Sequence, residues 1–219
     1  YFLCDSKSID ISLFEIKPSA WNIKIYSVSH CLIAWLAAFA YPQFFLFKIY
    51  LYILNKKNYG YTKAANQAIR KCDTEYILMF QADGLISNKD ISILLKSHKK
   101  YEDCFVASPT SYDKDSKLSY NGGCLPEKSL GMDVLNLEGD VCVETVLGSI
   151  ILFKKKDILE LGLFDENFFL YYLDFELCRR IINRKKSIIQ IFDAKVQHTH
   201  GQIKVKNPLK KVFIRNFNF

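Results

Sequence analysis

The sequence predicts an α/β protein in which a mixed, mostly parallel sheet is flanked by helices. Short apolar segments rich in β-branched and aromatic residues alternate along the chain with segments of helical periodicity. Half of the residues are apolar, which is enough for a substantial core, and the chain has only 9 glycines and 5 prolines. This composition excludes a disordered or low-complexity protein.

The chain has 219 residues, which suits one domain, 1–219, made of two closely fused halves that meet near residue 110. Its seven cysteines are odd in number, scattered and never arranged as C-x-x-C. Neither a disulfide framework nor a zinc site is therefore indicated. A reducing cytoplasm fits this cysteine usage best.

In the first half, strands and helices are expected to alternate. The predicted strands are residues 1–4, 49–54, 75–80 and 104–108, and the predicted helices are 61–71 and 91–99. The first of these helices has an apolar face formed by Ala65, Ala68, Ile69 and Cys72. Ser87 and Asp90 have the spacing of a capping box, which predicts that the second helix begins beside them.

In the second half, a long irregular segment at 109–143 contains Asn-Gly-Gly at 121–123, and such a segment is typical of functional or mobile loops. Strands are predicted at 149–153, 187–192 and 196–198. Helices are predicted at 156–161 and 174–184, the first ending at Gly162 and the second opened by Asp174.

One stretch, 25–47, contains no charged residue apart from His30 and is long enough to cross a bilayer. Pro42 and the polar residues at its start argue against a membrane-spanning helix. Crossing would also separate Asp5 from Asp83, two carboxylates that we assign to one site. We therefore expect the stretch to be partly helical and packed on the domain or on a membrane surface, without crossing it.

The net charge of +7 is compatible with nucleic acid, an anionic membrane or a phosphorylated substrate as partner. The lysines are spread along the chain and form no patterned helix or aromatic-interleaved sheet, which argues against nucleic acid. Only the basic and aromatic run at 204–219 is dense, and it indicates either peripheral membrane association or a solvated chain end. Tyr1 is not followed by a signal peptide, and the sequence has no initiator methionine, so we expect the chain to be N-terminally incomplete. We expect the protein to lie in the cytoplasm, at the inner face of the membrane.

Three carboxylates follow predicted strands or aromatic runs, where ligands bind in open α/β sheets: Asp5, Asp83 and Asp174. Hard carboxylate oxygens suit a divalent cation that neutralises a nucleotide diphosphate, and Asp83 is the strongest candidate. The alternative for Asp83 is a strand-end residue that closes a turn with Gly84.

Asp174 and the histidines near the end of the chain also have two interpretations each. Asp174 is either the N-cap of its helix or a general base that deprotonates an acceptor hydroxyl. His198 and His200 alternate on a predicted strand and would share one face. They either bind a metal ion or have a surface role.

Two blocks of the sequence resemble glycosyltransferase family 2. Residues 58–69 match its N-x-G-x-x-x-A-x-N-x-x-I pattern, and 76–83 match its strand-x-x-D pattern. The second block resembles the rhamnosyltransferase-like branch of the family and comprises 148–153, 161–169, 174–180 and 196–198. A weaker match places Asp5 in the D-x-x-S-x-D turn of the family's second strand.

The resemblance implies a GT-A-like, Rossmann-related fold, a divalent cation (Mg²⁺ or Mn²⁺) and an inverting displacement. Its nucleotide-donor half would be about 1–110, and its acceptor and catalytic half about 111–219. Asp174 would be the catalytic base, and Asp83 with His198 would hold the metal ion. The expected nucleotide-sugar-binding residues are Asp5, Gly60, Lys63, Asn66, Gln81 and Asp83.

The chain departs from the family pattern at three places. The opening strand and helix are absent before Tyr1, the usual Glu-Asp pair is Leu173-Asp174, and the D-x-D motif is Gln81-Ala82-Asp83. The leading hypothesis is an enzyme of cell-envelope polysaccharide biosynthesis that moves rhamnose or another hexose from a nucleotide-diphosphate donor to a glycan or lipid-linked acceptor. The alternative is a catalytically silent binding or scaffold protein.

A geometric expectation follows for the helix that begins at Asp174. A general base must face the acceptor, so Asp174 should line the same cleft as Asp83. Glu176 differs from Asp174 by about 200° around the helix. It should point away from the cleft and either face solvent or pair with Arg179 or Arg180.

Overall fold

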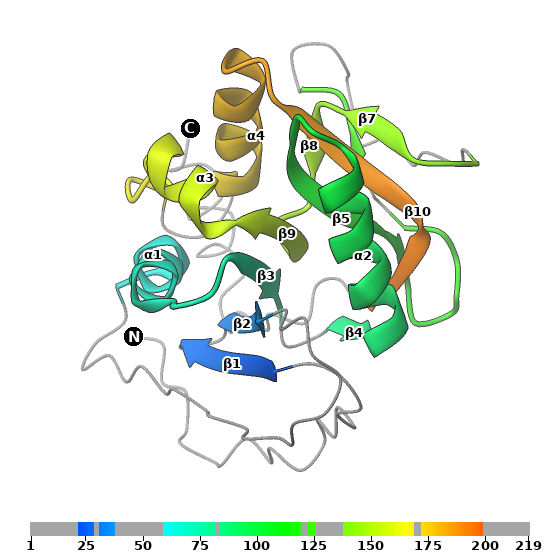
Figure 1. The fold of residues 1–219 in the computed structure, drawn as a ribbon, viewed down its shortest axis with the longest axis horizontal. Helices are drawn as coiled ribbons and strands as arrows, with labels where there is room; N and C mark the ends of the chain where they lie inside the picture. The colour runs from blue at the N-terminus through cyan, green and yellow to red at the C-terminus, as the bar shows by residue number, and fades with distance from the viewer. Residues whose placement is uncertain are drawn as a thin grey trace, which may run out of the picture.

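The computed structural model describes residues 22–28, 31–37, 59–81, 84–119, 122–125, 138–168 and 172–198. Within these ranges the strands are β1 (Asn22–Val28), β2 (Cys31–Ala37), β3 (Tyr76–Phe80), β4 (Gly84–Ile86), β5 (Cys104–Tyr112), β6 (Gly122–Gly123), β7 (Val141–Val143), β8 (Thr145–Val146), β9 (Ile150–Lys154) and β10 (Ser187–His198). The helices are α1 (Tyr61–Lys71), α2 (Asn88–Lys100), α3 (Lys155–Leu161) and α4 (Leu173–Asn183). The α/β class predicted from the sequence is confirmed (Figure 1).

The main sheet has the strand order β1-β2-β3-β9-β5-β10-β4, and β7 pairs with β10 outside this path. β3, β5 and β10 share one direction, because β9 is antiparallel to both β3 and β5, and β5 is parallel to β10. All other described pairs are antiparallel, so the expectation of a mostly parallel sheet is wrong for this part of the chain. Buried strands of either direction have the same apolar pattern, and the sequence therefore did not reveal the direction of β9.

The two faces of the sheet bury separate apolar clusters, as the period-two alternation of strands requires. Ile77 and Met79 of β3 pack in the cluster that includes α1, α3 and α4. Leu78 and Phe80 of the same strand pack with α2 on the other face. Figure 1 shows the same layers, with α2 on one side of the central strands and α1, α3 and α4 on the other.

All four predicted helices are present, although α2 begins three residues before the predicted start at 91 and the bounds of α3 and α4 differ from the prediction by one residue. α1 has the predicted bounds, and α2 is capped by the Ser87 hydroxyl, which accepts from the Asp90 backbone N–H at 3.2 Å. α3 ends at Gly162, which adopts a left-handed conformation (φ 99°) that a residue with a side chain rarely takes.

The predicted helix within 25–47 is wrong for the described part of that stretch. Residues 22–28 and 31–37 form an antiparallel hairpin, and β2 continues the sheet by pairing with β3. A short apolar run has the same pattern in a buried helix and in a buried strand, which explains the error. Among the described residues, no helix is both long and apolar enough to cross a membrane.

Two other boundaries differ from the prediction. β5 continues to Tyr112, so the predicted loop at 109–143 begins with strand residues and later contains β6 and β7. The two strands predicted at 187–192 and 196–198 are one strand, β10, whose pairing with β5 is irregular between Ile191 and Lys195. The strands predicted at 1–4 and 49–54 lie outside the described residues.

The α2 cap gives a stability prediction. Ser87→Ala removes the hydroxyl acceptor and should lower the free energy of unfolding by about 1 kcal/mol. Ser92→Ala is the matched control, because its hydroxyl donates to the Asn88 carbonyl within the same helix and should change stability by less than about 0.5 kcal/mol. Urea unfolding followed by circular dichroism measures both, and equal losses in the two variants would contradict the cap assignment.

Candidate active site

The carboxyl end of β3 meets the amino end of β9. Phe80 pairs with Ile150, and the backbone N–H of Gln81 donates to the Ser149 carbonyl at 2.9 Å. β9 therefore brings the Gly148-Ser149 segment beside the residue that follows β3. Gln81, one of the expected donor-binding residues, is half-buried at this position.

The first turn of α4 contacts the same segment. The Gly148 backbone N–H donates to Asp174 Oδ2 at 3.2 Å, and the Phe175 N–H donates to Oδ1 at 3.1 Å. A Cβ added to Gly148 would lie 3.2 Å from the Asp174 Cβ, which is tighter than ordinary contact. Glycine is therefore the residue that permits this close approach.

Asp174 is not the N-cap of α4, so that interpretation of the sequence is wrong. The cap position is Tyr172, which has a left-handed backbone (φ 65°) and makes no side-chain cap hydrogen bond. A non-glycine residue in this conformation costs free energy, and such residues concentrate at functional sites. Asp174 lies inside the first turn and reaches outside its own helix to Gly148.

The surroundings of Asp174 make its carboxylate more basic. Burial raises the pKa of Asp174 above its ordinary value of 3.8, while the N–H groups of Gly148 and Phe175 act in the opposite direction. The residue nevertheless keeps part of its surface accessible. A carboxylate with a raised pKa and an open side can accept a proton from a bound hydroxyl.

His198 ends β10 at the same end of the sheet. Its backbone pairs with Gly84, and the Gly84 N–H donates to the Gln81 carbonyl at 3.1 Å. The His198 side chain is 4% exposed. We call this end of the sheet, with Gln81, Gly148, Asp174 and His198, the Asp174 edge.

The remaining expected site residues lie elsewhere or outside the described part of the chain. Gly60 precedes α1, and Lys63 is exposed on that helix. Asn66 is buried and hydrogen-bonded to Phe164 and Glu166. Asp5, Asp83 and His200 lie outside the described residues.

Glu176 behaves as the helix geometry predicts. It pairs with Arg180 through two contacts, Nε to Oε1 at 2.5 Å and Nη2 to Oε2 at 2.7 Å. Arg180 also donates to the carbonyls of Leu161 and Leu163, at 3.0 and 2.7 Å. The Glu176 carboxylate thus binds Arg180, and Arg180 holds α4 against the end of α3.

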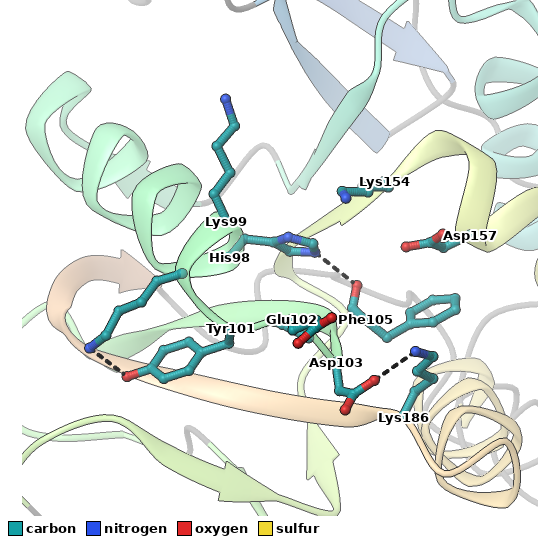
Figure 2. Close-up of a pocket in the computed structure, with 11 residues that line it drawn as sticks. His98, Lys99, Tyr101, Glu102, Asp103, Phe105, Lys154, Asp157 and Lys186 are labelled. Atoms are coloured by element: carbon teal, nitrogen blue, oxygen red, sulfur yellow. Dashed lines mark hydrogen bonds and ion pairs between the residues drawn. The ribbon is translucent and has the colours of Figure 1, made fainter.

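A pocket of about 380 Å³ opens at the opposite end of the sheet (Figure 2). It lies at the start of β5 and the end of β9, and its charged lining includes Lys99, Lys154 and Asp157. Lys186 is already paired with Asp103 at 2.8 Å across this pocket. Because Gly148 and Lys154 flank opposite ends of β9, the pocket is separate from the Asp174 edge.

Of the two metal ligands expected from the sequence, Asp83 and His198, the structure describes only His198. Among the described residues, no group of three or more histidine, cysteine or carboxylate side chains could hold a metal ion. His198 at the Asp174 edge supplies one imidazole, which does not form a cation site by itself. Asp83, the other metal ligand expected from the sequence, is not among the described residues.

Sequence reasoning missed the role of Gly148. The sequence presents this glycine only as the first residue of the 148–153 motif, whereas the structure shows that its N–H donates to Asp174. The available signal was a Gly-Ser pair directly before a buried strand, because a glycine at such a boundary often marks a close backbone approach.

Open α/β sheets bind ligands at the carboxyl ends of their strands, and Asp174 of α4 contacts Gly148, which directly precedes the residue paired with Gln81 after β3. The model of the family described as glycosyl transferase family 2 matches residues 37–153, more than half of the chain. The chain belongs to this family. The match includes Gln81 and Gly148, whereas Asp174 and His198 lie beyond it.

Two further similarities are to a sequence relative and to a solved structure, the second of which concerns the fold alone. The chain is 29% identical over 167 residues to dTDP-rhamnosyl transferase RfbF of Shigella flexneri, which covers 73% of the chain and 55% of that protein. The chain thus spans about half the length of this relative. The crystal structure of GalNAc-T7 with UDP, GalNAc and Mn²⁺ matches the fold with a TM-score of 0.54 at 13% identity, over 68% of this chain and 32% of that one.

The buried carboxylate gives a pH-dependent prediction. Because the pKa of Asp174 is higher in the folded state than in the unfolded state, its protonation stabilises the fold. This stabilisation is fully present below pH 3.8 and is lost as the pH rises through the folded-state pKa. Asp174→Asn should therefore raise the melting temperature at pH 7 by on the order of a few degrees, with a smaller gain at pH 4.

Thermal unfolding at pH 4, 5.5 and 7 measures this difference. Asp115→Asn is the control, because Asp115 is exposed and its replacement should leave the pH dependence unchanged. A loss of stability in Asp174→Asn that grows toward pH 7 would instead mean that the ionised carboxylate stabilises α4.

Proposed function

We propose that this chain is the catalytic part of a glycosyltransferase that moves a sugar from a nucleotide-diphosphate donor to an acceptor hydroxyl. The observation that carries the proposal is Asp174, held by the Gly148 N–H at 3.2 Å beside the residue that follows β3. Membership of glycosyl transferase family 2 supports the reaction class. The division into a donor half (about 1–110) and an acceptor and catalytic half (about 111–219) is part of the proposal.

Asp174 acts as the general base. The acceptor hydroxyl oxygen attacks the anomeric carbon of the donor, the bond from that carbon to the diphosphate breaks, and the hydroxyl proton moves to Asp174. Attack from the side opposite the leaving group inverts the anomeric carbon. The raised pKa of Asp174 brings its basicity closer to neutral pH, where proton transfer is most effective.

The donor lies along the Asp174 edge and extends to the start of α1, with Asp5, Gln81 and Asp83 as binding residues at the edge and Gly60 and Lys63 at α1. Rhamnose is the favoured sugar, because the relative from Shigella flexneri is named a dTDP-rhamnosyl transferase. Another hexose is the alternative. The acceptor is a glycan or a lipid-linked glycan of the cell envelope, reached at the inner face of the membrane.

A divalent cation, Mg²⁺ or Mn²⁺, would be held by Asp83 and His198 and would neutralise the charge of the departing diphosphate. Two observations support it. His198 lies at the Asp174 edge, and the fold neighbour GalNAc-T7 was crystallised with UDP and Mn²⁺. A catalytically silent binding protein is the second candidate function, favoured by Leu173 where the family has a glutamate.

Asp174→Asn tests the base assignment. It should reduce transfer by about 100- to 10,000-fold while donor affinity changes little, because a general base acts mainly in the transition state. Glu176→Gln is the matched control from the same helical turn and should keep transfer within a few-fold of wild type. Radiolabelled transfer and calorimetric donor titration measure the two quantities, and near-normal transfer by Asp174→Asn would refute the assignment.

Metal removal tests the cation. Chelation should reduce transfer by roughly 100-fold or more, and added Mn²⁺ should restore it, because a bound cation contributes several kcal/mol of charge stabilisation. Asp83→Ala should weaken Mn²⁺ uptake in the presence of a nucleoside diphosphate, which electron paramagnetic resonance detects without any turnover. Asp115→Ala is the control, and unchanged Mn²⁺ uptake by Asp83→Ala would contradict the ligand assignment.

A further inference from the structure

Asn66 of α1 forms a two-sided hydrogen-bond pair with the backbone of Phe164. Its Nδ2 donates to the Phe164 carbonyl at 2.8 Å, and its Oδ1 accepts from the Phe164 N–H at 3.0 Å. Nδ2 also donates to Glu166 Oε1 at 3.1 Å. The residue is 1% exposed, so its two bonds to Phe164 are shielded from water, and both ends of the amide are engaged.

Neighbouring residues of α1 extend this contact over the whole 164–168 turn. The Thr62 hydroxyl donates to the Phe168 carbonyl, and Arg70 lies 3.6 Å from Glu166. Within the turn, Asp165 Oδ1 accepts from the Asn167 N–H at 2.9 Å. One helix therefore fixes the beginning, middle and end of the turn.

The residues that directly precede this turn are held by α4. Arg180 donates to the carbonyls of Leu161 and Leu163. Leu163 has a left-handed backbone (φ 67°), a conformation that persists in a non-glycine residue only where the surroundings impose it. Residues 161–168 are thus constrained by Asn66 on one side and by Arg180 on the other.

We propose that Asn66 is a positioning residue, which sets the start of α4 and so places Asp174 against Gly148, instead of binding the donor. This inference rests on the proposed function, in which Asp174 is the base. Asp174 follows Phe168 by six residues, so a displaced turn changes where the helix begins. A displacement of about 1 Å at a reacting group can reduce turnover by about 100-fold.

The chemistry of the pair explains why an asparagine is required. Alanine would leave the Phe164 N–H and carbonyl without their partner in a buried place. Aspartate keeps the acceptor for the Phe164 N–H, loses both donated bonds, and sets a carboxylate beside Glu166. Both variants should loosen the 164–168 turn by different routes.

The test compares Asn66→Ala and Asn66→Asp with Gln67→Ala, a matched control from the next position of α1. Donor affinity is measured by calorimetry with the nucleotide sugar, and kcat and its pH dependence by transfer assay. We expect kcat to fall by about 100-fold in both Asn66 variants with donor Kd within about twofold of wild type. Gln67→Ala should change neither quantity.

A donor Kd that rises by the same factor as kcat/KM falls, at constant kcat, would overturn the proposal and make Asn66 a donor ligand. If Asn66→Ala fails to fold, Glu166→Ala decides, because it removes the outer bond to Asn66 and the ion pair with Arg70 but keeps both Phe164 bonds. It should lower kcat several-fold at constant Kd. Unchanged kcat in Glu166→Ala and Asn66→Asp would also overturn it.

Amide hydrogen exchange separates this proposal from the assignment of the base. Residues 172–178 should exchange faster in the Asn66 variants than in Gln67→Ala, whatever Asp174 does in catalysis. Unchanged exchange there would refute the positioning role. If Asp174→Asn stayed active while the Asn66 variants exchanged faster at 172–178, Asp174 would not be the base. The positioning of α4 by Asn66 would still hold.

Discussion

Strand β9 lies between β3 and β5, and the candidate site depends on this placement. Both faces of β9 are buried, so its register cannot slip without moving apolar side chains to the wrong cluster. In this register the Ser149 carbonyl accepts from the Gln81 N–H, and the Gly148 N–H donates to Asp174. A core constraint therefore sets the position of a polar group at the sheet edge.

The Asp174 carboxylate is held in a costly environment for a charge. Burial disfavours its ionised form, and two backbone N–H groups compensate only in part. The left-handed Tyr172 adds strain directly before it. A buried charge and a strained residue at the same helix start are features that functional sites often combine. Glu176, two residues on, is fully used in binding Arg180.

The sequence predicted the elements whose signals are local. α1, the α2 cap and the end of α3 depend on nearby residues and were placed correctly. The direction of β9, the hairpin at 22–37 and the continuity of β10 depend on partners distant in sequence, which periodicity does not identify. The pairing of Glu176 with Arg180 followed from helix geometry. The contacts of Asn66 with Phe164 and of Gly148 with Asp174 join residues 98 and 26 positions apart, and no local pattern identifies the distant partner.

The central claim is that the nucleotide sugar binds at the Asp174 edge. A crystal structure with an unreactive nucleotide-sugar analogue and Mn²⁺ tests it most directly. We expect the anomeric carbon of the donor to face Asp174, with the diphosphate near Gln81 and His198. A donor bound instead in the pocket lined by Lys99, Lys154 and Asp157, at the opposite end of β9, would contradict the account.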